Sequence, residues 1–331
     1  MKRLLRLVCC VSLTFTFHFS PFTLKAQDIH FSMLDLDPML FNPAYSGFFD
    51  GTGRFGIVYR NQWASVSKPF QTLSATAEFS LARSNRAMNG LSMGLWLTTD
   101  HEGTLSYGST AAALTMSYFQ SLDRSGSHIL SAAVEAGGGQ VGFSTDGISM
   151  DDPGEQFSRT RVSYPALGAG VAWFWQVSDI LYTKAGIAMR NINEPNISYL
   201  GMSDTRMARR LTAYARAEWR AAPQWGVMPL VGFQHQGSFS EMVVGCDARW
   251  YLRESQHDYL AFSGGIVGRI GDAVAVNLAM LWHEWTFAFS YDANISRLAA
   301  ASHTIGAFEA GVVYMIRKKD YRTRALPCPI F

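Results

Sequence analysis

Apolar and polar residues alternate with a period of two along most of the chain after residue 53. In the stretch 72–81 the residues between the apolar positions are Thr, Ser and Glu, and the apolar positions hold Leu73, Ala75, Ala77, Phe79 and Leu81. A β-strand places such alternating residues on opposite faces, whereas a helix would scatter them around its circumference. The stretch 210–219 repeats the pattern, so the chain is predicted to be rich in strands with one apolar face.

The pattern recurs in short blocks separated by polar or glycine-rich breaks, and no helical periodicity competes with it. It predicts an all-β fold of about fourteen strands. The expected strands lie near residues 53–60, 71–81, 90–99, 107–120, 128–142, 163–176, 180–190, 209–220, 226–235, 241–250, 259–268, 273–282, 285–292 and 306–316.

The polar faces of these strands carry charges at mid-strand positions. These residues are Arg54, Arg60, Glu78, Glu135, Lys184, Arg190, Arg216, Glu218, Asp247 and Arg249. Such charges would be costly in the dry core of a soluble β-sandwich, whereas the polar lumen of a membrane barrel accepts them. Aromatic residues also gather near strand ends, as in the girdles of membrane barrels: Trp63, Tyr107, Trp175, Trp219, Trp225, Trp250, Tyr251, Trp282, Trp285 and Tyr314. We therefore expect residues 51–316 to form a transmembrane antiparallel outer-membrane β-barrel.

The composition agrees with a wall that faces lipid. Hydrophobic residues make up 48% of the 331 residues and charged residues only 16%, against roughly 25% charged residues in a typical soluble domain. The formal net charge of +2 argues against a nucleic-acid-binding surface, which would need clustered positive charge. Outer-membrane lipid is thus an expected partner and nucleic acid is not.

The N-terminal residues 1–26 are typical of a cleaved signal peptide. Lys2, Arg3 and Arg6 precede an apolar stretch, 7–19, that is too short to span a membrane as a helix. We therefore expect export and a location in the outer membrane. Removal of this segment leaves 24 basic and 26 acidic residues, and the cysteines Cys246 and Cys328, which define no disulfide framework.

The lengths of the connections predict an orientation. With an even number of strands both ends of the barrel chain lie in the periplasm, and the longer connections should be extracellular. The longest ones, 143–162, 191–208 and 293–305, all follow odd-numbered strands, whereas 177–179 and 283–284 are tight.

Two further segments flank the barrel. Residues 27–50 lack clean alternation, and we expect them to plug or line the lumen. The tail 317–331 is basic, which fits either a solvated anchor or a contact with an acidic periplasmic partner. The basic residues proposed for that contact are Arg317, Lys318, Lys319, Arg322 and Arg324.

The chain carries no clear motif for catalysis, cofactors or metals. Its G-x-G-x-x-G at 51–56 opens a strand and is not a turn between strand and helix, so it does not indicate a dinucleotide site. The histidines are dispersed, no nucleophile-elbow sequence is present, and the acidic loop around 146–155 lacks the alternation of an EF-hand. We therefore expect a noncatalytic protein without a resident cofactor or metal, and keep a calcium-binding loop as a minor alternative.

Several stretches resemble the PorP/SprF family of outer-membrane proteins, which belong to the type IX secretion and gliding machinery of Bacteroidetes. The stretches that carry the resemblance, in order, are 28–32 (Asp-Ile-His-Phe-Ser), 41–47 (Phe-Asn-Pro-Ala-Tyr-Ser-Gly), 59–63 (Tyr-Arg-Asn-Gln-Trp), 191–195 (Asn-Ile-Asn-Glu-Pro), 291–296 (Tyr-Asp-Ala-Asn-Ile-Ser) and 327–329 (Pro-Cys-Pro). A departure is Phe308 before Glu309, where the family more often has a histidine.

The resemblance implies a noncatalytic barrel that works with the type IX translocon and periplasmic components. It would assist translocation or surface anchoring of cargo proteins with C-terminal sorting domains, including gliding adhesins where these occur. Three of the stretches fall on the expected extracellular rim and suggest a cargo-docking surface there, formed by Arg60, Gln62, Trp63, Asn191, Asn193, Pro195, Tyr291, Asp292 and Ser296. One alternative is that these motifs hold the loops together over the lumen. Another is that the barrel is a passive uptake channel for small or hydrophobic solutes.

Overall fold

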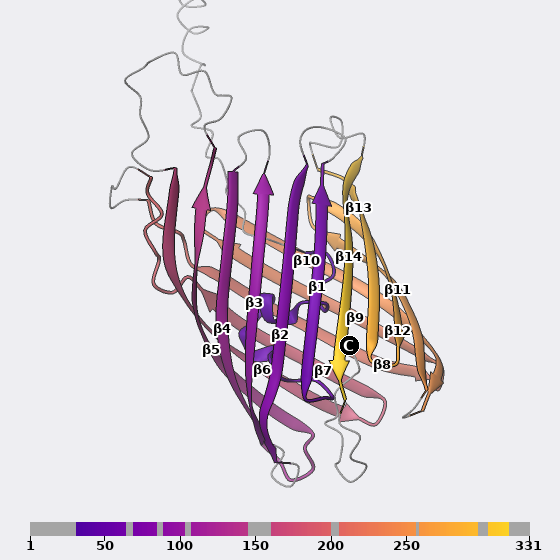
Figure 1. Cartoon of the computed structure of the whole chain (residues 1–331). Helices are drawn as coiled ribbons and strands as arrows, with labels where there is room; N and C mark the ends of the chain where they lie inside the picture. The colour runs from indigo at the N-terminus through magenta and orange to yellow at the C-terminus, as the bar shows by residue number, and fades with distance from the viewer. Residues whose placement is uncertain are drawn as a thin grey trace, which may run out of the picture.

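The computed structural model describes residues 31–63, 69–84, 89–102, 107–144, 160–199, 205–255, 258–296 and 304–317. Their strands form one closed antiparallel barrel in which each strand pairs with its neighbours in sequence and β1 pairs with β14 (Figure 1). The strands are β1 (Gly53–Gln62), β2 (Phe70–Ser84), β3 (Asn89–Glu102), β4 (Tyr107–Ser121), β5 (His128–Gly142), β6 (Arg161–Ser178), β7 (Leu181–Arg190), β8 (Arg210–Ala222), β9 (Trp225–Gln236), β10 (Phe239–Glu254), β11 (Tyr259–Arg269), β12 (Ala273–Trp282), β13 (Trp285–Asn294) and β14 (Ile305–Ile316).

This confirms the fourteen-stranded barrel predicted from the alternation. Among the described residues, no helix is both long and apolar enough to cross a membrane.

The two ends of the barrel differ in the length of their connections (Figure 1). At one end, named here the short-turn end, β1 begins and β14 ends, and β6 joins β7 through residues 179–180 alone. At the opposite, long-loop end, β5 connects to β6 and β7 to β8 through residues 143–160 and 191–209. The predicted asymmetry between the two sets of connections is therefore present.

The apolar face of each strand points outward and the polar face inward. In β2, for example, Leu73 and Phe79 are exposed, whereas Ser74 and Glu78 are buried inside the barrel. Nine of the ten mid-strand charges expected in the lumen are buried, and the tenth, Asp247, has a side chain only 12% exposed. Lipid can take the place of water around a wall of this kind, because its exposed side chains are apolar.

Several of the expected girdle tryptophans lie on the outer face near the short-turn end. They are exposed on strands β8 to β13 and comprise Trp219, Trp225, Trp250, Trp282 and Trp285. Tyr251 and Tyr107 were wrongly assigned to the girdles. Tyr251 directly follows Trp250 in β10 and therefore faces the lumen, where its hydroxyl donates to Glu218, and Tyr107 lines a cavity of the lumen.

The described residues just before β1 run inside the barrel (Figure 1). Residues 31–50, named here the inner segment, contain the short helices α2 (Pro38–Phe41) and η1 (Pro43–Tyr45). Proline begins each helix, and the Asn42 side chain accepts a hydrogen bond of 2.8 Å from the amide of Ala44. Gly47 has a φ of +76°, which a residue without a Cβ adopts readily, and it turns the chain toward β1.

Candidate functional site

The inner segment packs against the lumen wall through aromatic side chains. Phe41, Tyr45 and Phe48 are buried in one apolar cluster with residues of the wall. Tyr45 makes edge contacts with Phe174 of β6 and Tyr214 of β8, with ring centroids 5.8 and 6.1 Å apart. The interior of the barrel therefore holds an apolar core built from two parts of the chain that are distant in sequence.

Near the long-loop end, residues 32 and 33 join a buried group of charges. The Ser32 and Met33 amides donate to the two carboxylate oxygens of Glu309 in β14, at 2.6 and 3.1 Å, and the Ser32 hydroxyl donates to Asp292 in β13. Arg60 pairs with both acids, and Asp292 also lies 2.9 Å from the Nη2 of Arg269. We name this group the Ser32 network: Ser32, Met33, Arg60, Arg269, Asp292 and Glu309.

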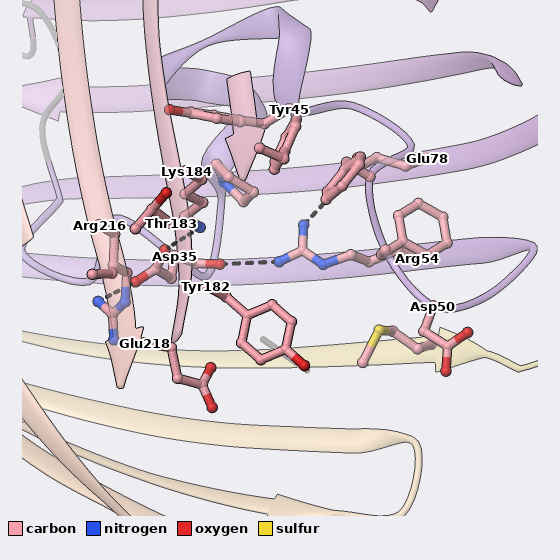
Figure 2. A pocket seen from close by; sticks show the side chains of 16 residues that line it. Asp35, Tyr45, Asp50, Arg54, Glu78, Tyr182, Thr183, Lys184, Arg216 and Glu218 are labelled. Atoms are coloured by element: carbon pink, nitrogen blue, oxygen red, sulfur yellow. Dashed lines mark hydrogen bonds and ion pairs between the residues drawn. The ribbon is translucent and has the colours of Figure 1, made fainter. Parts of the chain in front are cut away.

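Nearer the short-turn end, Asp35 supplies a carboxylate to two cations of the wall (Figure 2). Its oxygens lie 2.8 Å from Lys184 Nζ in β7 and 2.5 Å from Arg216 Nη1 in β8, and the Tyr214 hydroxyl donates to it at 3.1 Å. Arg216 also pairs with Asp247 at 2.8 Å. These five residues form the Asp35 network.

The two cations set the charge of Asp35. Burial alone would raise the pKa of this carboxyl, but Arg216 and Lys184 outweigh it and hold the pKa well below its usual range. Asp35 is therefore ionised at neutral pH, and the inner segment contributes a negative charge to the lumen.

Two arginines of the wall bind main-chain carbonyls of the inner segment. Arg54 donates to the carbonyls of residues 35 and 36 at 3.1 and 2.9 Å and pairs with Glu78 at 2.7 Å. Arg190 donates to the carbonyls of residues 39 and 40 and pairs with Glu135 at 2.8 Å. The paired carboxylates compensate the buried guanidinium charges, so the arginines bind neutral peptide groups without leaving an isolated charge.

The side chain of Asn42 is bound by the wall through main-chain groups. Its amide nitrogen donates to the carbonyls of Val171 in β6 and Ile187 in β7, at 3.0 and 3.2 Å. Glycines stand opposite: a Cβ on Gly170 would lie 2.2 Å from Asn42 Oδ1, and one on Gly186 would lie 2.6 Å from its Nδ2. The wall thus lacks side chains where the Asn-Pro turn approaches it.

Asp37 differs from Asp35 in lacking a cation partner among the described residues. The Ser74 hydroxyl donates to its Oδ2, and its Oδ1 has no hydrogen-bond partner within the described part of the chain. Burial raises the pKa of Asp37 to about 6, with Glu78 adding to the rise and Ser74 and Arg54 opposing it.

Free space remains on both sides of the inner segment. A cavity of about 700 Å³ lies toward the long-loop end, with Phe31, Leu40 and Asp37 among its floor residues and Trp96, Tyr107 and Arg190 among its walls. A pocket of about 40 Å³ lies toward the short-turn end, between Asp35, Lys184 and Arg54 (Figure 2).

The structure brings several residues of the predicted docking surface together, but inside the barrel. Arg60 and Asp292 are 2% and 0% exposed and both belong to the Ser32 network. Glu309, which follows the departure at Phe308, is also fully buried and contacts Ser32 and Arg60, both of which also contact Asp292. For Arg60 and Asp292, the geometry matches the alternative in which the motifs hold the loops together over the lumen, because both side chains are buried inside the barrel.

Asn193 completes the edge of a strand. β6 extends beyond its neighbour, since its pairing with β7 ends at Gly168 and Arg190. The Asn193 side chain accepts from the Leu167 amide at 3.1 Å and donates to the Pro165 carbonyl at 2.9 Å, in place of a paired strand. Asn191 is buried with a φ of +53°, and the nearby Pro195 is buried as well.

The remaining residues of the predicted rim make local contacts. Gln62 accepts from Arg60, Trp63 makes an edge contact with Phe70, and Tyr291 is exposed on the outer wall. Ser296 donates to the Asn294 side chain in a local turn. In the tail, Arg317 lies over the ring of Tyr259 at 5.7 Å, and the other basic residues proposed there, Lys318, Lys319, Arg322 and Arg324, are outside the described residues, as are the signal segment and the acidic loop.

No group of three or more His, Cys, Asp or Glu side chains in the described ranges is arranged to hold a metal ion. Cys246 is exposed on the outer face of β10, and Cys328 lies outside the described ranges.

The sequence did not single out Asp35, Glu309 or Arg269 as partners. A signal was available for the wall residues, because a charge on the polar face of an expected strand must point into the lumen. The ion pair of Asp35 with Lys184 joins positions 149 residues apart, and no local pattern predicts such a pair.

Comparison with known proteins agrees with this architecture. A family model described as "Type IX secretion system membrane protein PorP/SprF" matches residues 23–314. The structure is similar to the toluene transporter TbuX of Ralstonia pickettii, with a TM-score of 0.54 and 11% identity over 85% of this chain and 93% of that one. It is also similar to the toluene transporter TodX of Pseudomonas putida, with a TM-score of 0.50 and 10% identity over 84% and 92% of the two chains. These similarities show the fold of an outer-membrane barrel. A search of curated protein sequences finds no match.

Proposed function

Since the chain belongs to the PorP/SprF family of type IX secretion system membrane proteins, we propose that it is a noncatalytic outer-membrane component of that system which docks cargo polypeptides. It assists the translocation or surface anchoring of proteins with C-terminal sorting domains, and of gliding adhesins where the cell has them. Its partners are the translocon and its periplasmic components.

One observation carries this proposal: the lumen is occupied by the chain itself. Residues 31–50 cross the interior, pack an aromatic core against the wall and engage buried charges at Ser32 and Asp35. A folded cargo domain has no free path through such a lumen. The barrel therefore acts as a docking and assembly element beside the translocon, and not as its conduit.

In this proposal the long-loop end faces the cell exterior and receives cargo. Of the nine residues expected to form the docking surface, Gln62 and Ser296 keep polar side chains that are not fully buried, and Asn193 is exposed but has its amide bound to the edge of β6. Arg60, Asn191, Pro195 and Asp292 support them from below, and Trp63 and Tyr291 mark the outer edge of the rim. At the periplasmic side, the basic residues from 317 to 324 contact an acidic partner.

Deletion of the gene tests the proposal directly. Cargo with a C-terminal sorting domain should fail to reach the cell surface, while uptake of small solutes stays unchanged. The protein extracted in mild detergent should bring translocon or periplasmic components with it. Normal cargo display in the deletion strain would contradict the proposal.

A passive channel for small or hydrophobic solutes is the second candidate. It is favoured by the cavity of about 700 Å³, whose volume suits a small ligand, and the similar barrels TbuX and TodX are toluene transporters. Flux of small solutes into liposomes that contain the purified protein would support this candidate. The secretion role predicts that such liposomes remain nearly impermeable.

A further inference from the structure

The lumen wall binds the inner segment chiefly through its main chain. Besides Arg54 and Arg190, the hydroxyls of Thr212, Ser131 and Ser117 donate to the carbonyls of residues 41, 44 and 46, each at 2.7 Å. Arg83 donates to the carbonyls of residues 47 and 49 at 3.0 and 3.1 Å. Carbonyl groups spread over most of the segment are therefore bound by side chains of the wall.

Wall carboxylates complete this pattern by accepting from main-chain amides. Glu309 accepts from the amides of residues 32 and 33, and Glu78 accepts from that of residue 47 at 3.0 Å. Each of these partners is buried, so each contact is made where water competes poorly for it. Peptide groups are common to all polypeptides, and a site that binds them tolerates different side chains.

The side-chain requirements of the site are few. An acid is needed at position 35 to meet Lys184 and Arg216, and an Asn-Pro turn is needed at 42–43 to fit between Gly170 and Gly186. Aromatic side chains at 41, 45 and 48 fill the apolar core. Departure of the segment would leave Lys184 without the Asp35 carboxylate in a buried position, which favours an acidic replacement.

We propose that the lumen is a polypeptide-binding site, occupied in this structure by the chain's own inner segment, which a segment of a cargo polypeptide can replace. The cargo segment carries an acidic residue seven positions before an Asn-Pro turn with flanking aromatic residues, and its main chain takes over the contacts of residues 32–49. The identification of cargo as the source of the segment rests on the proposed secretion function.

Exchange of peptides in the intact barrel tests this inference. A recognition sequence for a site-specific protease is inserted between Asp50 and Gly51 of the full chain, the protein is folded and purified in detergent, and the site is then cleaved. We expect the cleaved inner segment to stay bound. A fluorescent peptide of residues 27–50 should then replace it, as measured by fluorescence anisotropy.

Three altered peptides separate main-chain binding from side-chain binding. A peptide that keeps only Asp35, Asn42, Pro43 and the aromatic positions, with its other residues changed, should bind within about threefold of the native peptide. One N-methylated at Ser32 and Met33 should bind at least tenfold more weakly, because it cannot donate to Glu309. The matched control is methylated at Leu34, whose amide meets no acceptor among the described residues, and should bind like the native peptide.

A pair of wall variants gives an independent measurement. The double substitution Ser117→Ala and Ser131→Ala removes two donors to carbonyls without leaving a buried charge, and should weaken peptide binding about tenfold or more. Ser92→Ala is the control, since Ser92 is fully buried near Gly47 and its hydroxyl has no partner among the described residues. Both proteins should keep the thermal stability of the barrel, so that a change in binding is not a failure to fold.

Two results would overturn the inference. If no added peptide replaces the cleaved segment, the segment is a permanent part of the core. If only the native sequence binds, the site accepts the inner segment of another copy but not cargo. The peptide-exchange assay contains no secretion component. A negative result in it would therefore overturn this inference without contradicting the proposed secretion function, which cargo display in the deletion strain tests separately.

Discussion

The Ser32 network and the Asp35 network hold the same inner segment in physically different ways. In the Ser32 network the charges belong to the wall: Arg60 and Arg269 pair with Asp292 and Glu309, and the segment adds only neutral amides and a hydroxyl. In the Asp35 network the segment itself supplies the carboxylate for Lys184 and Arg216. The first network can therefore stabilise the barrel without the segment, whereas the second depends on it.

Asp292→Asn should produce the largest effect, and it should act on the barrel. The substitution leaves Arg60 and Arg269, both nearly fully buried, without their shared carboxylate. Removing one partner of a buried ion pair costs about 3 to 5 kcal/mol. The temperature at which the detergent-solubilised barrel unfolds, followed by gel mobility, should fall markedly. Asp258→Asn, which breaks an exposed pair with Arg253, is the control and should cost under about 1 kcal/mol. If both substitutions lowered the unfolding temperature equally, the Ser32 network would not stabilise the barrel in the way described.

Asp35→Asn should loosen the inner segment while the barrel stays folded. The amide cannot pair with Lys184 and Arg216, and loss of a hydrogen-bonded charge contact costs about 2 to 3 kcal/mol. Limited proteolysis should cut residues 31–50 faster, with the unfolding temperature of the barrel little changed. Asp50→Asn is the matched control, because Asp50 lines the same pocket but pairs with no cation among the described residues. A large drop in the unfolding temperature for Asp35→Asn would show that the two networks are not separable.

Gly170→Ala should displace the inner segment at its Asn42–Pro43 turn, outside both networks. The new Cβ would lie 2.2 Å from Asn42 Oδ1 and 3.0 Å from Ala188 Cβ. Overpacking of this kind costs about 2 kcal/mol, and the measurement is again the rate of proteolysis within residues 31–50. At Gly232, which also faces the lumen, an added Cβ meets nothing closer than 3.5 Å. Gly232→Ala should therefore leave the proteolysis rate unchanged, and similar rates in both variants would argue against a close fit at Asn42.

The pH dependence should give the smallest effect and comes from Asp37. Its pKa is about 6 in the folded protein, against about 3.9 for an exposed aspartate. The folded state thus binds the proton more tightly, so binding of the inner segment is strongest below about pH 4 and weakens as the pH rises toward 6. The proteolysis rate should be about tenfold higher at pH 7 than at pH 5. Asp37→Asn should abolish most of this difference in the proteolysis rate. If the variant kept the pH profile of the native protein, the pH dependence would come from another titratable group.

The sequence predicted the wall far better than its contents. Alternation placed Lys184 and Arg216 on the inner face correctly, because the pleat of a strand forces that assignment. It could not show that Asp35 lies between them, since the partners are far apart in sequence and the inner segment has no regular period. Neighbouring residues of a strand face opposite sides, so alternation places Tyr251 inside the barrel if Trp250 is outside. The girdle prediction relied on the clustering of aromatic residues near strand ends and did not apply this rule to Tyr251.

Asn193 illustrates how far the docking surface could be predicted from the sequence. A polar residue in a motif near the rim looked available for a partner, whereas its amide closes the unpaired edge of β6 at Pro165 and Leu167. The lengths of β6 and β7, and hence the existence of that edge, follow from the register of the whole barrel. No local pattern contains that information.

Arg60 and Glu309 stand directly opposite each other where β1 meets β14, and this position fixes an order of events. Glu309 is the acceptor for Ser32, 277 positions earlier in the chain, so the anchor does not exist until nearly all of the protein has been synthesised and exported. Contacts over such separations form late, because a long loop must close first. The donor, Ser32, is among the first residues of the described chain to be made, yet its contact with Glu309 forms only once β14 is in place.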